Sequence, residues 1–290
     1  MWFHSCLTMN QKIDRIKELR KDGFSIREIS KQLTLSYSSV RKYSFGVEMT
    51  TEGKLKYSST NGITKQITID PRLSIEKVRI ISNLLFDGAV YNVEYHYSIM
   101  YINGSRNLVD QFRNDMKIVY GVEPSSFEIC QSNTSTYFRI KYLSKVIYED
   151  LLTYFNTYST SKENCLMPNW LLNADQNIKI IFLQAFFANE GSISVSGKLA
   201  ADLKNKAIIF HLSKFCKDLG LKNYITRYYK QGWAYKLILN LSEENYQRFL
   251  ELGLFSDAVV MKGFFKGMRK VDVLINYCSK RSWNIAQEPR

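Results

Sequence analysis

Apolar residues recur at helical spacing over the first part of the chain, with polar residues between them. The apolar positions are Ile13, Ile16, Leu19, Ile26, Ile29, Leu33, Val40 and Tyr43. Ser25 is suited to cap the second run, and Ser36 or Ser38 the third, because a serine hydroxyl accepts hydrogen bonds from the free N–H groups of a helix start. The pattern predicts three short helices within residues 10–44, with turns at "DG" and at "TLS".

The stretch "GFSIREISKQLTLSYSSVRKY" resembles the helix-turn-helix of resolvases and small regulators, in which the last helix enters the major groove of DNA. That resemblance places five residues against DNA, namely Tyr37, Ser38, Ser39, Arg41 and Lys42. A three-helix module that packs only against protein fits the same spacing. We favour DNA contact because the second helix, the turn and the third helix are spaced as in the motif.

Residues 45–71 carry no helical period and are rich in Gly, Ser, Thr and Lys. This composition is typical of a linker, within which only "KQITI" predicts a short strand. From residue 72 onward one order of elements occurs twice: a helix, two strands, a helix, two strands and a helix. The predicted organisation is an all-α domain at 1–44, the linker at 45–71, α+β repeats at 72–160 and 161–255, and a C-terminal extension at 256–290.

The first helix of each repeat is predicted to end on an acid followed by a glycine, Asp87-Gly88 in "RIISNLLFDGAV" and Glu190-Gly191 in "FLQAFFANEG". The C-terminal end of a helix carries partial negative charge from its unpaired carbonyl groups, so an acid there is repelled. A cation is therefore expected to compensate the acids. The glycines are expected at positive φ, since a turn directly from helix to strand often needs that conformation.

These two helices resemble the LAGLIDADG motif of homing endonucleases, in the single-chain form in which two repeats imitate a dimer. The resemblance covers residues 72–255 and implies a duplicated α-β-β-α-β-β-α fold whose antiparallel sheets form a saddle on DNA. It also implies that the motif helices pack side by side at a pseudo-twofold axis, with the small residues Ser82 and Ala185 at the contact. We therefore expect a monomer in which the two acids meet at the bottom of the helix pair.

The same resemblance implies metal-dependent hydrolysis of double-stranded DNA. It makes Asp87 and Glu190 ligands of Mg²⁺, with Mn²⁺ as a substitute, in a site that activates water for attack on a phosphate. Gly88 and Gly191 are placed in the same metal site. Asn103, at the end of the second strand, is assigned a catalytic role in orienting water.

One part of the family pattern is missing from this chain. Homing endonucleases often carry a lysine near the end of the fourth strand of each repeat, where it organises water at the scissile phosphate. Here Ser144 and Ser242 stand at the equivalent places, and Lys145 lies one step away in the first repeat only. Bacterial regulators exist in which a LAGLIDADG-like fold has lost its acids and binds DNA beside a similar N-terminal module. This chain keeps both acids, which favours cleavage.

After Gly191 the segment "SISVSGK" alternates, which predicts a strand with Ile193 and Val195 toward the helices. Its other face is expected to lie in the major groove, together with basic residues of neighbouring strands. The predicted DNA-binding residues of the sheets are Arg139, Lys141, Ser192, Ser194, Ser196, Lys198, Arg227, Lys230 and Lys236. A half-solvated sheet face without a ligand also fits the alternation.

Composition narrows the class of partner. The net charge of +13 and the isoelectric point near 9.4 favour a polyanion, nucleic acid above all. The apolar stretches are far shorter than the ~20 residues that a membrane span requires. Five scattered cysteines and three histidines form no zinc-binding pattern, so we expect reduced thiols in a soluble, cytoplasmic, nucleoid-associated protein. The helical pattern begins at Met9, an alternative start to Met1.

Two functions of different classes follow. As an enzyme, the protein is a site-specific DNA endonuclease that recognises a long target. As a binding protein, it is a transcription regulator built on a silent endonuclease scaffold. An RNA-splicing maturase shares the basic surface and has no separate signature in the sequence. The two intact acids favour the endonuclease.

Overall fold

The computed structural model describes residues 8–50, 52–53, 67, 69–94, 96–131, 135–229 and 232–281. The chain divides into two compact units, Met1–Ile67 and Thr68–Arg290. Of the predicted strand at "KQITI", residues 65, 66 and 68 lie outside the described residues, and Ile67 and Ile69 are not in a strand. Within those residues, no helix combines the length and the apolar character needed to cross a membrane.

The first unit contains three helices, α1 (Met9–Lys21), α2 (Ile26–Leu33) and α3 (Tyr37–Ser44). Each helix begins at a hydroxyl cap that accepts a hydrogen bond from the first turn: Thr8, Ser25 and Ser36, respectively. Four fully buried side chains join the helices, namely Ile16, Leu19, Ile29 and Val40. The apolar spacing in the sequence thus corresponds to one small core.

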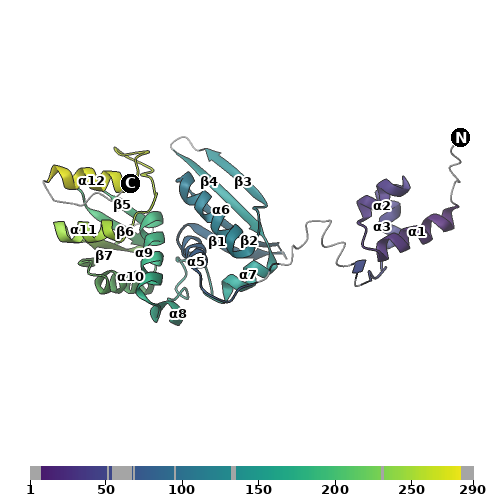
Figure 1. Ribbon diagram of the computed structural model, residues 1–290, viewed down its shortest axis with the longest axis horizontal. Coiled ribbons are helices and arrows are strands. Elements are labelled where there is room, and N and C mark those ends of the chain that lie inside the picture. Colours follow the sequence, from purple (N-terminus) through teal and green to yellow (C-terminus); the bar gives the residue numbers. More distant parts are fainter. Residues whose placement is uncertain are drawn as a thin grey trace. The chain divides into compact units, whose positions relative to one another are not determined.

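The second unit contains the repeated order of elements (Figure 1). The first repeat consists of α5 (Ile75–Asp87), β1 (Gly88–Val93), β2 (His96–Asn103), α6 (Arg106–Tyr120), β3 (Ser126–Gln131), β4 (Thr136–Leu143) and α7 (Lys145–Leu152). The second consists of α9 (Gln176–Glu190), β5 (Gly191–Ile193), β6 (Leu199–Leu203), α10 (Lys206–Asp218), β7 (Asn223–Tyr229), β8 (Trp233–Leu239) and α11 (Glu243–Glu251). A short helix, α8 (Asn169–Leu172), lies between the repeats, and α12 (Lys270–Lys280) follows them.

The two antiparallel sheets have matching strand orders, β1-β2-β4-β3 and β5-β6-β8-β7. Helices cover one face of each sheet (Figure 1). In the first sheet, Tyr101 pairs with Ile140, and both side chains are completely buried under the helices. The side chains directly before and after these residues in each strand point to the other side of the sheet, which we call the open face. The predicted α+β duplication is confirmed.

Helices α5 and α9 lie side by side between the two sheets (Figure 1). The Phe86 ring packs against Phe182 and Phe186, with centroids 5.3 and 5.2 Å apart. Ser82 and Ala185, the small residues expected at the contact, are both buried. A polar bond also crosses the pair, because the Asn189 amide donates to the side-chain oxygen of Asn83 at 2.9 Å. The helix pair therefore joins the repeats through apolar packing and one directional bond.

Gly88 and Gly191 are not at positive φ, and that expectation is wrong. Their φ values are −119° and −71°. Glycine is needed for a different reason, since the strand leaves the helix so closely that a side chain has no room. A β-carbon on Gly88 would lie 2.5 Å from the Leu84 α-carbon, and one on Gly191 would overlap the Phe187 carbonyl oxygen.

The strand predicted over "SISVSGK" ends after Ile193, and the expectation that Val195 faces the helices is wrong. Residues 194–197 form a tight turn, in which the Gly197 N–H donates to the Ser194 carbonyl at 2.9 Å. Val195 is 68% exposed at this turn. The alternation of apolar and polar residues in the sequence extends into residues 194–197, where the backbone reverses direction.

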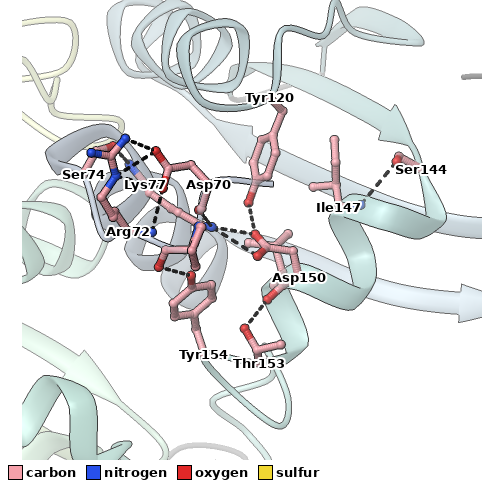
Figure 2. A network of polar contacts seen from close by, with 12 residues as sticks. Asp70, Arg72, Ser74, Lys77, Tyr120, Ser144, Ile147, Asp150, Thr153 and Tyr154 are labelled. Atoms are coloured by element: carbon pink, nitrogen blue, oxygen red, sulfur yellow. Dashed lines mark hydrogen bonds and ion pairs between the residues drawn. The ribbon is translucent and has the colours of Figure 1, made fainter. Parts of the chain in front are cut away.

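A buried ion pair holds the start of α5 against the end of the first repeat (Figure 2). The Lys77 ammonium lies 3.0 Å from a carboxylate oxygen of Asp150 and donates to the Asp70 carbonyl at 2.9 Å. Tyr120 donates its hydroxyl proton to Asp150 at 2.7 Å. Burial and the adjacent Asp150 carboxylate raise the pKa of Tyr120, so the phenol remains a donor. The polar bonds offset the cost of burying both charges.

Replacing Lys77 with Met should lower the free energy of unfolding by about 3–5 kcal/mol, because it leaves the Asp150 carboxylate buried without its cation. Lys145→Met is the matched control, since Lys145 forms a surface pair with Glu149 at 3.5 Å and should change stability by less than about 0.5 kcal/mol. Urea unfolding measures both variants. Equal stability of the two variants would show that the buried pair contributes nothing specific.

Candidate metal and nucleic-acid site

Asp87 and Glu190 are the last residues of α5 and α9, and the packing of these helices brings the two carboxyl groups close enough to interact electrostatically. Each side chain is half-buried. The Asn103 amide donates to one Asp87 oxygen at 2.9 Å. Since Asn103 also accepts the Ser105 N–H at 2.7 Å, its amide is oriented with the NH₂ group toward the acid. Asn103 therefore positions Asp87.

The electrostatics of the two acids are coupled. Burial raises the pKa of Asp87, while Lys270 and the Asn103 hydrogen bond act in the opposite direction. Burial, together with the negative charge of Asp87, raises the pKa of Glu190 to about 8. Near neutral pH Glu190 thus tends to hold its proton unless a further cation binds. Two carboxyl groups that are close and desolvated cannot both ionise cheaply.

Lys270, the first residue of α12, is the cation that the chain itself provides at this site. Its ammonium donates to the carbonyl oxygens of Ala188 at 2.8 Å and Gly191 at 2.6 Å, and it is 7% exposed. It interacts electrostatically with both acids, while burial lowers its own pKa to about 8. A cation at the C-terminal end of a helix is stabilising. The compensating charge expected from the sequence is therefore present within the protein.

Sequence reasoning missed Lys270 because the residue lies in the C-terminal extension, to which no role was assigned. The absence of lysines from the ends of the fourth strands was the available signal that another cation takes part. Lys270 also affects which of the predicted residues can bind a metal. The Gly191 carbonyl accepts a hydrogen bond from the Lys270 ammonium, and this positive charge opposes metal binding at the same oxygen. The assignment of Gly88 to the metal site stays a prediction.

A network of amides extends from Asp87 across the two repeats. Asn103 donates to both Asp87 and the Asn189 side-chain oxygen, the latter at 2.8 Å. The Tyr101 hydroxyl donates to the same Asn189 oxygen at 2.8 Å. Asn189 in turn donates to Asn83 and to the Ala185 carbonyl. This network links β2 of the first repeat to both central helices and fixes the position of Asp87.

The donor set fits a divalent cation that is shared with a phosphate. Among the residues that the structure describes, no group of three or more His, Cys, Asp and Glu side chains could enclose a metal. Two carboxylates and one ammonium carry a net negative charge when both acids are ionised. Mg²⁺ is commonly held by one or two carboxylates together with substrate phosphate and water. Asp87 and Glu190 meet that requirement.

The basic residues predicted on the first sheet lie on its open face. Arg139 and Lys141 flank the buried Ile140 on β4, so their side chains point to the opposite side of the sheet from Ile140. Arg139 forms an ion pair with Glu128, its neighbour on β3, at 3.0 Å. A phosphate that approached Arg139 would have to compete with this carboxylate.

The second sheet corrects the expectation of one basic face. Lys236 lies on the open face, where it pairs with Asp202 at 3.4 Å. Arg227 pairs in register with Tyr235, so it lies on the side covered by helices and not beside Lys236. Asp202 is an acid that sequence reasoning missed, and its charge contributes to the raised pKa of Glu190.

The other predicted contacts are distributed between the open face and the turn. Ser192 lies on β5, where its hydroxyl donates to the Ala200 carbonyl at 3.1 Å. Ser194 and Ser196 belong to the turn and bond to each other at 2.8 Å, and Lys198 is exposed beside them. Lys230 lies outside the described residues. These residues remain predictions as DNA contacts.

The third helix of the first unit presents most of its predicted contacts to solvent. Tyr37, Ser38, Arg41 and Lys42 are exposed. Ser39 is less available, because its hydroxyl is hydrogen-bonded to the Ser36 hydroxyl of the helix cap at 2.8 Å. Lys42 also lies over the Tyr43 ring.

The chain is similar to solved structures of LAGLIDADG proteins, the group that its sequence resembles. I-DmoI, a homing endonuclease solved with DNA and Mn, is 20% identical over 64% of this chain and 98% of its own, with a TM-score of 0.48. Full-length DUF199/WhiA from Thermatoga maritima is 15% identical over 73% of this chain and 63% of its own, with a TM-score of 0.47. No protein-family model and no curated protein matches the chain. The likeness concerns the fold and assigns no role to any residue.

Replacing Lys270 with Met should lower the free energy of unfolding by about 2–4 kcal/mol, because it leaves helix carbonyls unpaired and both acids uncompensated. Added Mg²⁺ should restore part of this loss, since a bound cation takes over the compensation. Lys280→Met, at the exposed far end of the same helix, is the control and should change little. Thermal unfolding with and without Mg²⁺ measures the effect. An unchanged melting temperature for Lys270→Met would contradict this role.

Proposed function

We propose that this protein is a site-specific endonuclease for double-stranded DNA that uses Mg²⁺ or Mn²⁺. The observation that carries the proposal is the meeting of Asp87 and Glu190 at the ends of adjacent helices, where both carboxyl groups are desolvated. Such a placement raises the energy of the protein alone, as the raised pKa values show. A bound cation and a phosphate would make it favourable.

The open faces of the two sheets support a long duplex as substrate. Arg139 and Lys141 on the first sheet and Lys236 on the second provide cations for phosphates. Their partners Glu128 and Asp202 hold Arg139 and Lys236 in place while the site is free of DNA. Contacts to base edges would come from neutral polar side chains such as Ser192.

Each residue at the acid site has a separate task. Asp87 and Glu190 would hold the divalent cation, and Asn103 would keep one Asp87 oxygen fixed while the other stays available. When bound, the cation stabilises negative charge on the phosphate and lowers the pKa of water. Lys270 would limit the repulsion between the two acids and the incoming phosphate.

A second function, sequence-specific regulation of transcription without cleavage, is favoured by one observation. The Lys270 ammonium already compensates the acids and uses the Gly191 carbonyl. A site neutralised in this way can approach DNA phosphates without metal. The two functions differ in a direct measurement, namely nicking of plasmid DNA in Mg²⁺ or Mn²⁺.

Asp87→Asn and Glu190→Gln should each abolish cleavage of a plasmid pool that carries random inserts, because each removes a metal ligand. The affinity for DNA should stay the same or rise, since a negative charge facing phosphates is lost. Asp110→Asn, an exposed acid paired with Arg106 on α6, is the control and should cleave normally. If the unaltered protein binds a selected duplex but nicks no plasmid with either metal, the regulator function replaces the endonuclease.

The three-helix unit should add DNA affinity through Arg41 and Lys42. Replacing both with Ala should flatten the dependence of log K on log[salt] by roughly one to two units, because each lost phosphate contact releases about 0.9 fewer counterions. Arg15→Ala with Lys17→Ala removes the same charge from exposed positions of α1 and is the matched control. Equal salt slopes for the two double variants would show that α3 makes no specific phosphate contact.

A further inference from the structure

A cavity of about 800 Å³ lies on the helix-covered side of the second sheet, away from the open face that carries Lys236. It is bounded by the start of α10, the end of β7, the start of β8, and the loop at 161–163. Its volume is in the range of sites that hold a small organic ligand. The acid site and the proposed duplex surface make no use of it.

The cavity lining is cationic. Lys162, Lys204, Lys206 and Arg227 line it, against one acid, Glu163. Within the described part of the chain, none of the four cations forms an ion pair, whereas Lys236 on the opposite face is paired with Asp202. The positive charge of the cavity is thus available to an anionic ligand.

Exposed aromatic rings stand among these cations. The Arg227 guanidinium lies over the Trp233 ring at 3.5 Å from its centroid, and the Lys206 ammonium lies over Phe210 at 5.9 Å. Trp233 is 52% exposed and Phe210 is 51% exposed. Large aromatic side chains left half in water beside unpaired cations offer flat apolar faces together with charge.

One wall of the cavity is fixed by Asn205, which is 7% exposed. Its amide donates to the carbonyls of Lys162 and Cys165 at 3.1 and 2.8 Å, and its oxygen accepts the Ile208 N–H at 3.0 Å. The same side chain therefore caps α10 and holds the loop against it. The site is formed before any ligand arrives, which lowers the entropic cost of binding.

We propose that this cavity binds an unpaired nucleotide of a single-stranded nucleic acid. A phosphate would meet Lys204, Lys206 and Arg227, and the base would stack on the exposed Trp233 or Phe210 ring. Cations that follow a backbone, together with aromatic faces for the bases, are the usual combination at single-strand sites. A duplex cannot use these rings, because its bases are stacked on one another. The proposal is independent of DNA cleavage.

The test measures binding of fluorescent oligothymidylate and oligouridylate of about 12 nucleotides to the full chain by anisotropy. Trp233→Ala should weaken binding about tenfold, since base stacking on one aromatic residue contributes that much. Lys204→Ala with Lys206→Ala tests the phosphate contacts without altering the rings. Lys217→Ala is the single-charge control, about 16 Å farther along the same helix, and Lys214→Ala with Lys217→Ala removes the same charge as the double cavity variant from exposed positions. Thermal unfolding verifies that each variant is folded.

Two comparisons decide the outcome. An abasic oligonucleotide of the same length should bind the unaltered protein several-fold more weakly and should be insensitive to Trp233→Ala. Binding of a duplex should also be unaffected by that substitution. The proposal is overturned if the abasic strand binds as tightly as the normal strand, if Trp233→Ala weakens duplex binding equally, or if Lys217→Ala has the effect of the cavity variants.

Discussion

Repulsion between two carboxyl groups at the C-terminal ends of α5 and α9 is the constraint on which the centre of this protein depends. Helix dipoles, burial and proximity all disfavour ionisation of Asp87 and Glu190 together. Packing of Phe86 against the opposite helix nevertheless holds the pair together. The surroundings must therefore supply positive charge or hydrogen-bond donors, and they do so differently for the two acids.

The first repeat supplies a neutral donor to Asp87, and the C-terminal extension supplies a cation that interacts with both acids. Asn103 donates to Asp87 from β2. By strand register the equivalent position in β6 is Leu203, which has no polar group and leaves Glu190 without such a donor. Lys270 enters on that side and bonds to the carbonyls at the end of α9. The pseudo-symmetry of the backbone is thus broken by the chemistry around the acids, so the two acids have different proton affinities.

Local pattern was sufficient to predict the repeated order of helices and strands and the positions of the two acids at helix ends, but not α8 or α12. Asp87 and Glu190 end helices whose apolar runs and following glycines are visible in the sequence, and duplication indicated that they are equivalent. Lys270 was not predictable in this way, because its contact joins α12 to α9 across roughly 80 residues of chain. The place of Arg227 depends on the register of the β7–β8 hairpin, and a shift of one residue moves a side chain to the other face. Val195 was misplaced because a turn replaced the expected strand.

The two acids of the site differ in how strongly their charge depends on a bound cation. Glu190, with a pKa near 8, is the acid whose charge depends most on a bound cation. Burial also raises the pKa of Asp87, but Lys270 and the Asn103 hydrogen bond act against that rise, and Glu190 has no equivalent of the Asn103 bond among the described contacts. A divalent ion that binds with DNA would therefore displace a proton chiefly from Glu190, since a metal and a proton compete for the same oxygens. Lys270 would oppose this ion by repulsion, so under the proposed function the balance between the ammonium and the metal would decide between DNA binding alone and cleavage.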